Sequence, residues 1–138
     1  MSKLTREIVT TNNAARPKLP FNQAIVANRF VYLSGCVGCD KDTMELVPGG
    51  AVPEMAKALD HVKAILIAAG SGVDKVVKAT IFLQDMADFA NVNQEYIKVF
   101  PKNYPARTCV QVAKLPLNAK VEIEVVALTG DVETISKL

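Results

Sequence analysis

The chain has 138 residues, of which 50% are hydrophobic and 22% are charged, proportions that are usual for a globular protein. This length predicts one domain over residues 1–138 with a substantial core. The net charge of +2 is too small to indicate binding to nucleic acid or to an anionic membrane. No apolar run approaches the roughly 20 residues of a membrane-spanning helix, so no membrane partner is expected.

The two ends of the chain carry information about location. The first residues, MSKLTREIVTTNNAARPKL, lack the apolar core of a secretion signal, which predicts that the chain is not secreted. Three cysteines, an odd number, fit a reducing compartment with free thiols. The last residues, Ser136-Lys137-Leu138, match an address for peroxisomal import in a eukaryote; the alternative is a chance tripeptide in a frayed tail. The sequence predicts a cytoplasmic protein, or one imported into peroxisomes.

The first third of the chain predicts short strands and a long loop. A strand is expected at Glu7–Thr10, followed by the loop Asn12–Pro20. Ile25-Val26 and Phe30–Ser34 predict a hairpin with a tight turn between its strands. Gly35–Gly50 is rich in glycine and aspartate, which indicates a loop of the kind that often carries function.

Pro53–Ala69 predicts the first helix. Proline suits the beginning of a helix, Glu54 suits its first turn and Gly70 suits its end. The apolar residues recur at helical spacing and predict one buried face. These residues are Met55, Ala56, Leu59, Val62, Leu66 and Ala69.

The middle of the chain predicts a strand and a second helix. The strand is expected at Val76–Gln84, because apolar residues alternate along it. Asp88 is expected to cap the second helix, which ends before Pro101. The residues expected to face the core are Val77, Ala79, Ile81 and Leu83 in the strand, and Phe89, Val92, Tyr96 and Val99 in the helix.

The last two predicted strands, about Arg107–Ala113 and Val121–Leu128, are joined by a short loop and are expected to form a hairpin. Side chains of a strand alternate in direction, so residues two apart share a face. If the apolar faces of both strands meet one core, the polar residues share the other face. That face would be able to do chemistry, or it would be a solvated surface with weak ion pairs. Its residues are Arg107, Cys109, Gln111, Glu122 and Glu124.

The element order β-ββ-α-β-α-β-β predicts an α+β fold, a single mixed β-sheet with two helices packed on one face. The face without helices would carry apolar residues among its charges, and it is too apolar to remain in water. We therefore expect subunits to bury this face against each other. Its apolar residues are Phe82, Cys109, Val126 and Leu128.

Other reactive residues do not form a convincing site. Cys36-Val-Gly-Cys39 has the spacing of half a zinc knuckle or a redox pair, but the chain lacks the second half. His61 falls off the apolar stripe of the first helix and is expected to be exposed. Ser34 has no histidine placed to activate it. Arg107 is the best candidate, since its guanidinium matches a carboxylate and a nearby glutamate could activate water.

The run Tyr104-Pro-Ala-Arg-Thr-Cys-Val-Gln-Val-Ala-Lys-Leu-Pro116, with Val121-Glu-Ile-Glu-Val-Val-Ala127, closely resembles the signature of the RidA/YjgF family of reactive-intermediate (2-iminobutanoate/2-iminopropanoate) deaminases. The resemblance covers roughly Ile8 to Gly130. It implies a chorismate-mutase-like α+β fold, assembled as a homotrimer with active sites between subunits. Further matches are Pro20-Phe-Asn-Gln-Ala24, Tyr32-Leu-Ser-Gly35, Val77-Lys-Ala-Thr80 and Asp88-Phe-Ala-Asn-Val-Asn93.

The resemblance also implies an activity. Members hydrolyse 2-imino acids, which pyridoxal-phosphate enzymes release, to 2-keto acids and ammonia, and no metal or organic cofactor is expected. Arg107 matches the arginine that binds the substrate carboxylate, and Glu122 matches the glutamate that positions or activates water. The implied pocket also contains Cys109 as a contact and not a nucleophile, Asn93, the Ser34-Gly35 segment, and the position of Phe21.

Two residues depart from the family pattern. Phe21 stands where a tyrosine is common, which removes a hydroxyl near the substrate, and Cys36 stands where glutamine is common. Two other functions stay open: an endoribonuclease that inhibits translation, and a non-catalytic ligand binder or chaperone-like protein. Against the ribonuclease, the chain has one histidine and no basic aromatic track for RNA.

Overall fold

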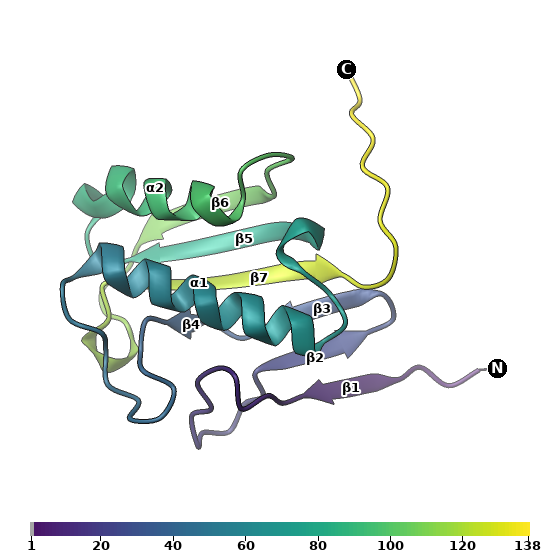
Figure 1. The fold of residues 1–138 in the computed structure, drawn as a ribbon, viewed down its shortest axis with the longest axis horizontal. Helices are drawn as coiled ribbons and strands as arrows, with labels where there is room; N and C mark the ends of the chain where they lie inside the picture. The colour runs from purple at the N-terminus through teal and green to yellow at the C-terminus, as the bar shows by residue number, and fades with distance from the viewer. Residues whose placement is uncertain (1) are drawn as a thin grey trace.

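The computed structural model describes residues 2–138 as one seven-stranded mixed sheet with two α-helices on one face (Figure 1). The strand order is β1-β2-β3-β7-β5-β6, and the short β4 also pairs with β7. The predicted α+β architecture is confirmed. The elements are β1 Arg6–Val9, β2 Ala24–Ala27, β3 Phe30–Leu33, β4 Cys36–Val37, α1 Ala51–Ala68, β5 Val76–Leu83, α2 Phe89–Val99, β6 Ala106–Gln111 and β7 Val121–Leu128, with 3₁₀ turns η1 Val73–Lys75, η2 Met86–Asp88 and η3 Pro116–Asn118.

The predicted hairpin of the last two strands is wrong, because β5 lies between β6 and β7. β5 runs antiparallel to β7 and parallel to β6, and α2 forms the crossover between the two parallel strands. The loop after β6 therefore passes the end of β5 before β7 begins. Two backbone bonds mark this path: Gln84 N–H donates to the Lys120 carbonyl, and Val112 N–H donates to the Leu83 carbonyl.

Helix α1 begins two residues before the predicted start. Pro53 is therefore its third residue, where a backbone N–H has no intrahelical acceptor and proline removes nothing. Gly70 ends the helix with φ of +77°, a conformation that glycine adopts without strain. The buried face is broader than the predicted stripe: Ala58, His61 and Ile65 are buried, whereas Ala56 and Ala69 are only partly so.

Strand β5 differs from the prediction at its beginning. A register irregularity lies between Val76 and Lys78 in the pairing with β7. Val76 consequently faces the core, and Val77, predicted as a core residue, is exposed. A bulge of this kind adds one residue to a strand, so the alternation that follows is shifted relative to its start.

The predicted loop Gly35–Gly50 contains one short strand. Cys36 and Val37 form β4, opposite Ile123 and Glu122 of β7. An isolated bridge between Cys39 and Leu46 closes the rest of the loop on itself. This pairing brings the Ser34–Cys36 segment beside Glu122, which no periodicity in the loop indicates.

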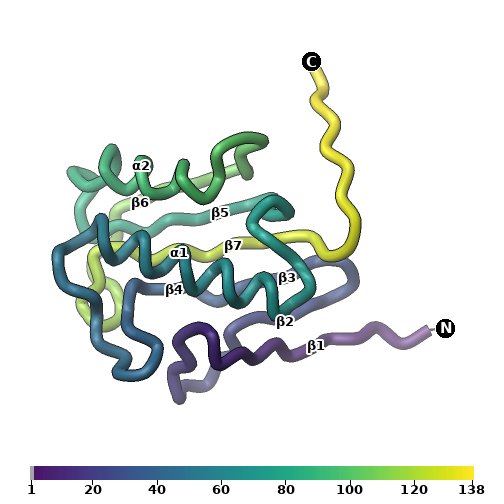
Figure 2. The backbone as a smooth tube through the Cα atoms, in the orientation of Figure 1, coloured from purple at the N-terminus to yellow at the C-terminus, as the bar shows by residue number. Residues whose placement is uncertain are grey.

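The sheet has one covered and one open face. Ala79, Ile81, Ile123 and Val125 pack under the helices and are fully buried. The opposite face carries exposed aromatic and apolar residues, with Phe30, Tyr32 and Val110 each at least 40% exposed. No helix among residues 2–138 has the length and apolar character to cross a membrane. Figure 2 shows the C-terminal segment after β7 leaving the sheet as an extended chain.

Candidate functional site

Helix α2 and the beginning of β6 form a cleft of about 370 Å³, which we call the α2–β6 cleft. Helix α2 contributes residues spaced along one face, and the turn before β6 contributes the other wall. The cleft is mostly apolar and has few polar groups, as is typical of small-ligand sites. Its lining residues are Asn93, Tyr96, Ile97, Tyr104, Pro105 and Arg107.

Arg107 is the cationic group of this cleft. Its Cζ atom lies 4.8 Å from the ring centroid of Tyr96 and 5.6 Å from that of Phe89, both on α2. Within residues 2–138 the guanidinium has no hydrogen bond and no ion pair. A guanidinium offers five donors in a planar fork. The aromatic contacts leave all of these donors available to a ligand.

Tyr96 is only 6% exposed, and its buried hydroxyl has no hydrogen-bond partner among residues 2–138. Burial raises the pKa of this phenol, and the charge of Arg107 acts in the opposite direction. A buried polar atom without a partner is rare in folded proteins and costs free energy. The α2–β6 cleft therefore contains two side chains, Arg107 and Tyr96, whose polar groups have no hydrogen-bond partner in the part of the chain that the structure describes.

Cys109 lies on the same side of the sheet as Arg107 and packs against the core. Burial raises the pKa of its thiol, and Arg107 opposes this shift only in part. A raised pKa keeps the sulfur protonated near neutral pH, and the thiolate is the reactive form of cysteine. The environment of Cys109 agrees with a contact and not with a nucleophile.

A second group of predicted site residues lies around the junction of β3, β4 and β7. Gly35 approaches the Glu122 side chain so closely that a Cβ built on Gly35 would lie 2.7 Å from Glu122 Cδ. The Ser34 hydroxyl donates to the Asn22 carbonyl over 2.6 Å. Phe21 is 47% exposed and, with Ser34 and Gly35, lines part of a small cavity that also contacts His61. We call Phe21, Ser34, Gly35 and Glu122 the Glu122 group.

Glu122 is half-buried, and its carboxyl has a raised pKa. Burial is the larger cause and the negative charge of Glu124 is the second. A carboxylate with a raised pKa is a stronger base than an exposed glutamate. Glu122 therefore has the properties of a group that can accept a proton from water.

The prediction that Arg107, Cys109, Gln111, Glu122 and Glu124 share one face is wrong. Register with β5 places Arg107 opposite Ala79 and Cys109 opposite Ile81, on the helix-covered face. Glu122 pairs with Phe82 and Glu124 with Thr80, on the open face. Because β5 lies between β6 and β7, these two strands do not pair, and no hairpin register links the directions of their side chains. One chain thus holds Arg107 and Glu122 on opposite sides of its sheet. Cys109 is likewise absent from the open face.

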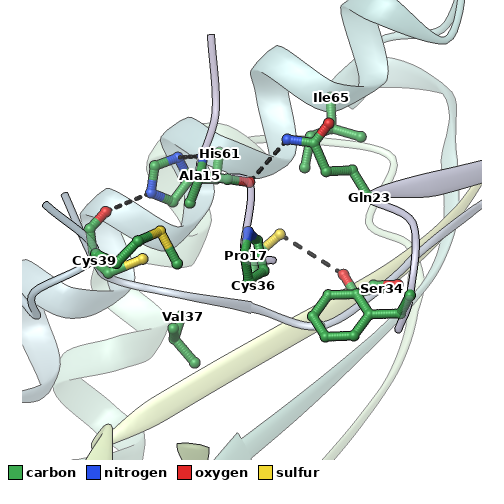
Figure 3. Close-up of a pocket in the computed structure, with 12 residues that line it drawn as sticks. Ala15, Pro17, Gln23, Ser34, Cys36, Val37, Cys39, His61 and Ile65 are labelled. Atoms are coloured by element: carbon green, nitrogen blue, oxygen red, sulfur yellow. Dashed lines mark hydrogen bonds between the residues drawn. The ribbon is translucent and has the colours of Figure 1, made fainter. Parts of the chain in front are cut away.

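A small cavity of about 50 Å³ lies between α1, the segment Ala15–Pro17 and β4 (Figure 3). Several of its polar side chains are bonded within the protein. Gln23 donates to the carbonyls of Thr11 and Ala15 and accepts from Thr11 N–H. The Cys36 thiol lies 3.7 Å from the Ser34 carbonyl oxygen.

His61 is buried beside this cavity, so its predicted exposure is wrong. Nε2 lies 2.6 Å from the Cys39 carbonyl and Nδ1 lies 3.4 Å from Ala15 N (Figure 3). These contacts fit a neutral ring that donates from Nε2 and accepts at Nδ1. Burial lowers the pKa of the imidazole, against smaller opposing contributions that include the Cys39 carbonyl. The histidine joins α1 to two loops.

The cysteine pair of the sequence also lies here. Cys36 and Cys39 are buried free thiols, and burial raises the pKa of Cys36 to about 12, with Glu122 and Cys39 adding to the shift. Thiols with raised pKa values are inert as nucleophiles. Residues 2–138 contain no group of three or more histidine, cysteine, aspartate or glutamate side chains that could hold a metal ion.

Sequence reasoning missed the surroundings of Arg107. Phe89 and Tyr96 were predicted only as apolar residues of the second helix, yet both rings contact the guanidinium. A signal was present: Phe89, Asn93 and Tyr96 are four and three residues apart, which places them on one face of a helix. No local pattern in the sequence predicts that this face packs over β6.

Comparison with known proteins supplies further information. The family model for Endoribonuclease L-PSP matches residues 11–129. The chain is 59% identical to RutC family protein UK114 of Drosophila melanogaster over 97% of both chains. It is 43% identical to 2-iminobutanoate/2-iminopropanoate deaminase of Capra hircus over 99% of both. The crystal structure of E. coli TdcF with bound serine superposes with a TM-score of 0.85 at 35% identity, covering 90% of this chain and 99% of that one.

Proposed function

This chain belongs to the Endoribonuclease L-PSP family, also called the RidA/YjgF family, and from that premise we propose that it hydrolyses reactive 2-imino acids to 2-keto acids and ammonia. The substrates are small acids such as 2-iminobutanoate and 2-iminopropanoate. The observation that carries this proposal is the Arg107 guanidinium, which faces an apolar cleft with its donors unpaired within residues 2–138.

Arg107 binds the carboxylate that every 2-imino acid carries. A guanidinium can donate two parallel hydrogen bonds to one carboxylate, which fixes the orientation of the ligand as well as its charge. Such charge-assisted bonds contribute about 1.5–3 kcal/mol when well placed. Asn93 lines the same cleft and offers an amide to the ligand.

Glu122 positions and deprotonates the attacking water. Its oxygen accepts a proton as the water oxygen bonds to the iminium carbon, and the C=N π electrons move to nitrogen. Protonated Glu122 returns its proton to the carbinolamine nitrogen, the C–N bond breaks with its electron pair leaving on ammonia, and the hydroxyl loses its proton to that ammonia and becomes the keto oxygen. The net change is one iminium acid and one water giving one keto acid and one ammonium ion.

The two halves of this site come from two different copies of the chain. Arg107 and the Glu122 group lie on opposite sides of one sheet, so a ligand between them must bridge two subunits. The open face bears Phe30, Tyr32 and Val110, an apolar surface of the kind that oligomers bury. We propose a homotrimer in which Arg107, Asn93 and Cys109 of one subunit face the Glu122 group of the next.

Phe21 contributes an apolar wall in place of a phenol. Its ring is exposed beside Ser34 and Gly35, so it can contact the substrate but cannot donate a hydrogen bond. A lost hydrogen bond corresponds to about 0.5–1.5 kcal/mol, or up to roughly tenfold in rate. A Phe21→Tyr variant is expected to gain at most that amount.

Ribonuclease chemistry has less support. His61, the single histidine, is buried and engaged with Cys39 and Ala15, so it cannot serve as an acid or base for RNA.

Peroxisomal import stays a prediction: Ser136–Leu138 is exposed, and where Leu138 is the terminal residue a receptor could reach it. Localisation of an N-terminal fluorescent fusion, with and without these three residues, tests it.

The test of the proposed activity uses an amino-acid oxidase to generate 2-iminobutanoate or 2-iminopropanoate in the presence of semicarbazide. Wild-type protein is expected to suppress semicarbazone formation, because it removes the imine first. Arg107→Ala is expected not to suppress it, and Arg6→Ala, an exposed arginine on β1, is the matched control. Lack of suppression by wild type would contradict the activity and favour a non-catalytic binder.

A further inference from the structure

The α2–β6 cleft holds Arg107 by an arrangement that the proposed chemistry does not by itself require. We propose that Tyr96 and Phe89 of α2 form an aromatic clamp that fixes the plane of the Arg107 guanidinium, so that Tyr96 is a positioning residue for carboxylate binding. The identity of the ligand rests on the proposed function. The geometry of the clamp does not.

The clamp is built by helical spacing. Phe89 and Tyr96 are seven residues apart, two turns of α2, so their side chains lie on one face of the helix. Both ring centroids lie within about 6 Å of the guanidinium carbon, the range of cation–π contacts. Phe100 packs on Tyr96 with ring centroids 4.6 Å apart, which restrains the Tyr96 ring itself.

Among residues 2–138, no hydrogen bond or ion pair restrains the guanidinium. It projects from β6, the last strand of the sheet. An unrestrained arginine loses side-chain entropy when a ligand immobilises it. The rings reduce that cost before the ligand arrives and leave the N–H edge of the fork free for a carboxylate.

The tyrosine hydroxyl provides a matched control. It is buried and unpartnered, so Tyr96→Phe removes it while keeping the ring that contacts Arg107. Tyr96→Leu removes the ring and keeps an apolar side chain at the same position. Phe89→Leu removes the other, half-buried ring of the clamp and serves if Tyr96→Leu fails to fold.

The first measurement is the dissociation constant of 2-ketobutyrate, the expected product, by calorimetry with the folded oligomer. Tyr96→Phe is expected to bind within about twofold of wild type, and Tyr96→Leu about fivefold more weakly, the effect of one cation–π contact. In an Arg107→Lys background the Tyr96→Leu change is expected to have less than a twofold effect, because no guanidinium plane remains to be fixed. Equal weakening in both backgrounds would overturn the clamp.

The second measurement needs no ligand. Rotation about the Nε–Cζ bond of Arg107, followed by NMR of the guanidinium nitrogens, reports how firmly its plane is held. Wild type and Tyr96→Phe are expected to rotate slowly, and Tyr96→Leu and Phe89→Leu several-fold faster. Equal rotation in all four proteins would overturn the proposal. If wild type fails to bind 2-ketobutyrate, the proposed function fails, while rotation still decides the clamp.

Discussion

The α2–β6 cleft and the cavity beside His61 differ in how far their polar groups are hydrogen-bonded within the protein. Besides Phe21, Ser34 and Gly35 of the Glu122 group, the cavity contains one histidine and a Cys-x-x-Cys motif, which suggest a reactive site in the sequence; yet His61 and Gln23 are bonded internally and the thiols are buried with raised pKa values. The cleft contains the Arg107 guanidinium, whose donors are unpaired within residues 2–138. Polar groups that are satisfied internally stabilise a fold, and those left unpaired are available to a ligand.

The largest effect that would sharpen this comparison is expected at Glu122. Glu122→Gln keeps the size of the side chain but removes the base, so kcat should fall by about 10²- to 10⁴-fold. Glu124→Gln, two residues away and exposed, is the matched control and should retain most activity. Near-normal turnover by Glu122→Gln would show that water is activated elsewhere.

The pH dependence of turnover follows from the same residue. The carboxyl of Glu122 has a raised pKa, and the base is lost when it is protonated, so kcat should decline as the pH falls through a value above 4.5. Because Glu124 contributes to the shift, Glu124→Gln should move the midpoint of this decline to lower pH. A pH profile of kcat for both proteins measures this midpoint. A midpoint that does not move would show that protonation of Glu122 is not the cause of the decline.

The next effect concerns Arg107. Lysine keeps the charge but not the fork, so Arg107→Lys should raise KM by about 10- to 100-fold, the value of a charge-assisted hydrogen bond. Arg6→Lys, the same substitution on the exposed part of β1, should leave KM unchanged. Steady-state kinetics of the coupled oxidase assay distinguishes the two. A Lys variant with normal KM would remove Arg107 from the binding site.

A smaller effect is expected at Gly35. Alanine would place a Cβ 2.7 Å from Glu122 Cδ, so the carboxylate must move and kcat should fall by about tenfold or more. The backbone of Gly35 is not in the left-handed region, so the change tests the close approach and not a turn. In a Glu122→Gln background the same substitution should cost little further. Additive losses would mean that Gly35 acts independently of Glu122.

The smallest effect concerns the cavity beside His61 and is a change in the pH dependence of folding stability. Burial lowers the pKa of His61 below 6.5, so the folded state favours the neutral ring. Stability should be full above pH 6.5 and decrease as the pH falls through the lower folded pKa, by at most about 1.4 kcal/mol per pH unit. With one histidine in the chain, His61→Gln should abolish the histidine part of this slope in urea unfolding. An unchanged slope would contradict a buried neutral His61.

The sequence predicted the helices and strands of this fold better than the order in which the strands lie in the sheet. Periodicity located both helices and the strand Val121–Leu128, because each has a one-sided apolar pattern that only a core can explain. It did not reveal that β5 separates β6 from β7, since strand order depends on a parallel crossover and not on local pattern.

The candidate site shows the same division. Side-chain chemistry predicts Arg107 and the family signature adds Glu122, but their positions on opposite sides of the sheet depend on the pairing register with β5. The prediction of an exposed His61 is wrong because two loops that are distant in sequence, one at Ala15 and one at Cys39, cover its face of the helix. Contacts made by distant backbone atoms leave no periodic trace in the residues that receive them.

The most direct test of the account is complementation between two inactive variants. If Arg107 of one subunit faces Glu122 of the next, mixing Arg107→Ala and Glu122→Gln chains, followed by unfolding and reassembly, should restore complete sites. With random assembly of equal amounts, about one quarter of the sites should carry both native residues, and turnover should recover to about that fraction of wild type. Reassembled mixtures that remain as inactive as the separate variants would contradict a site shared between subunits.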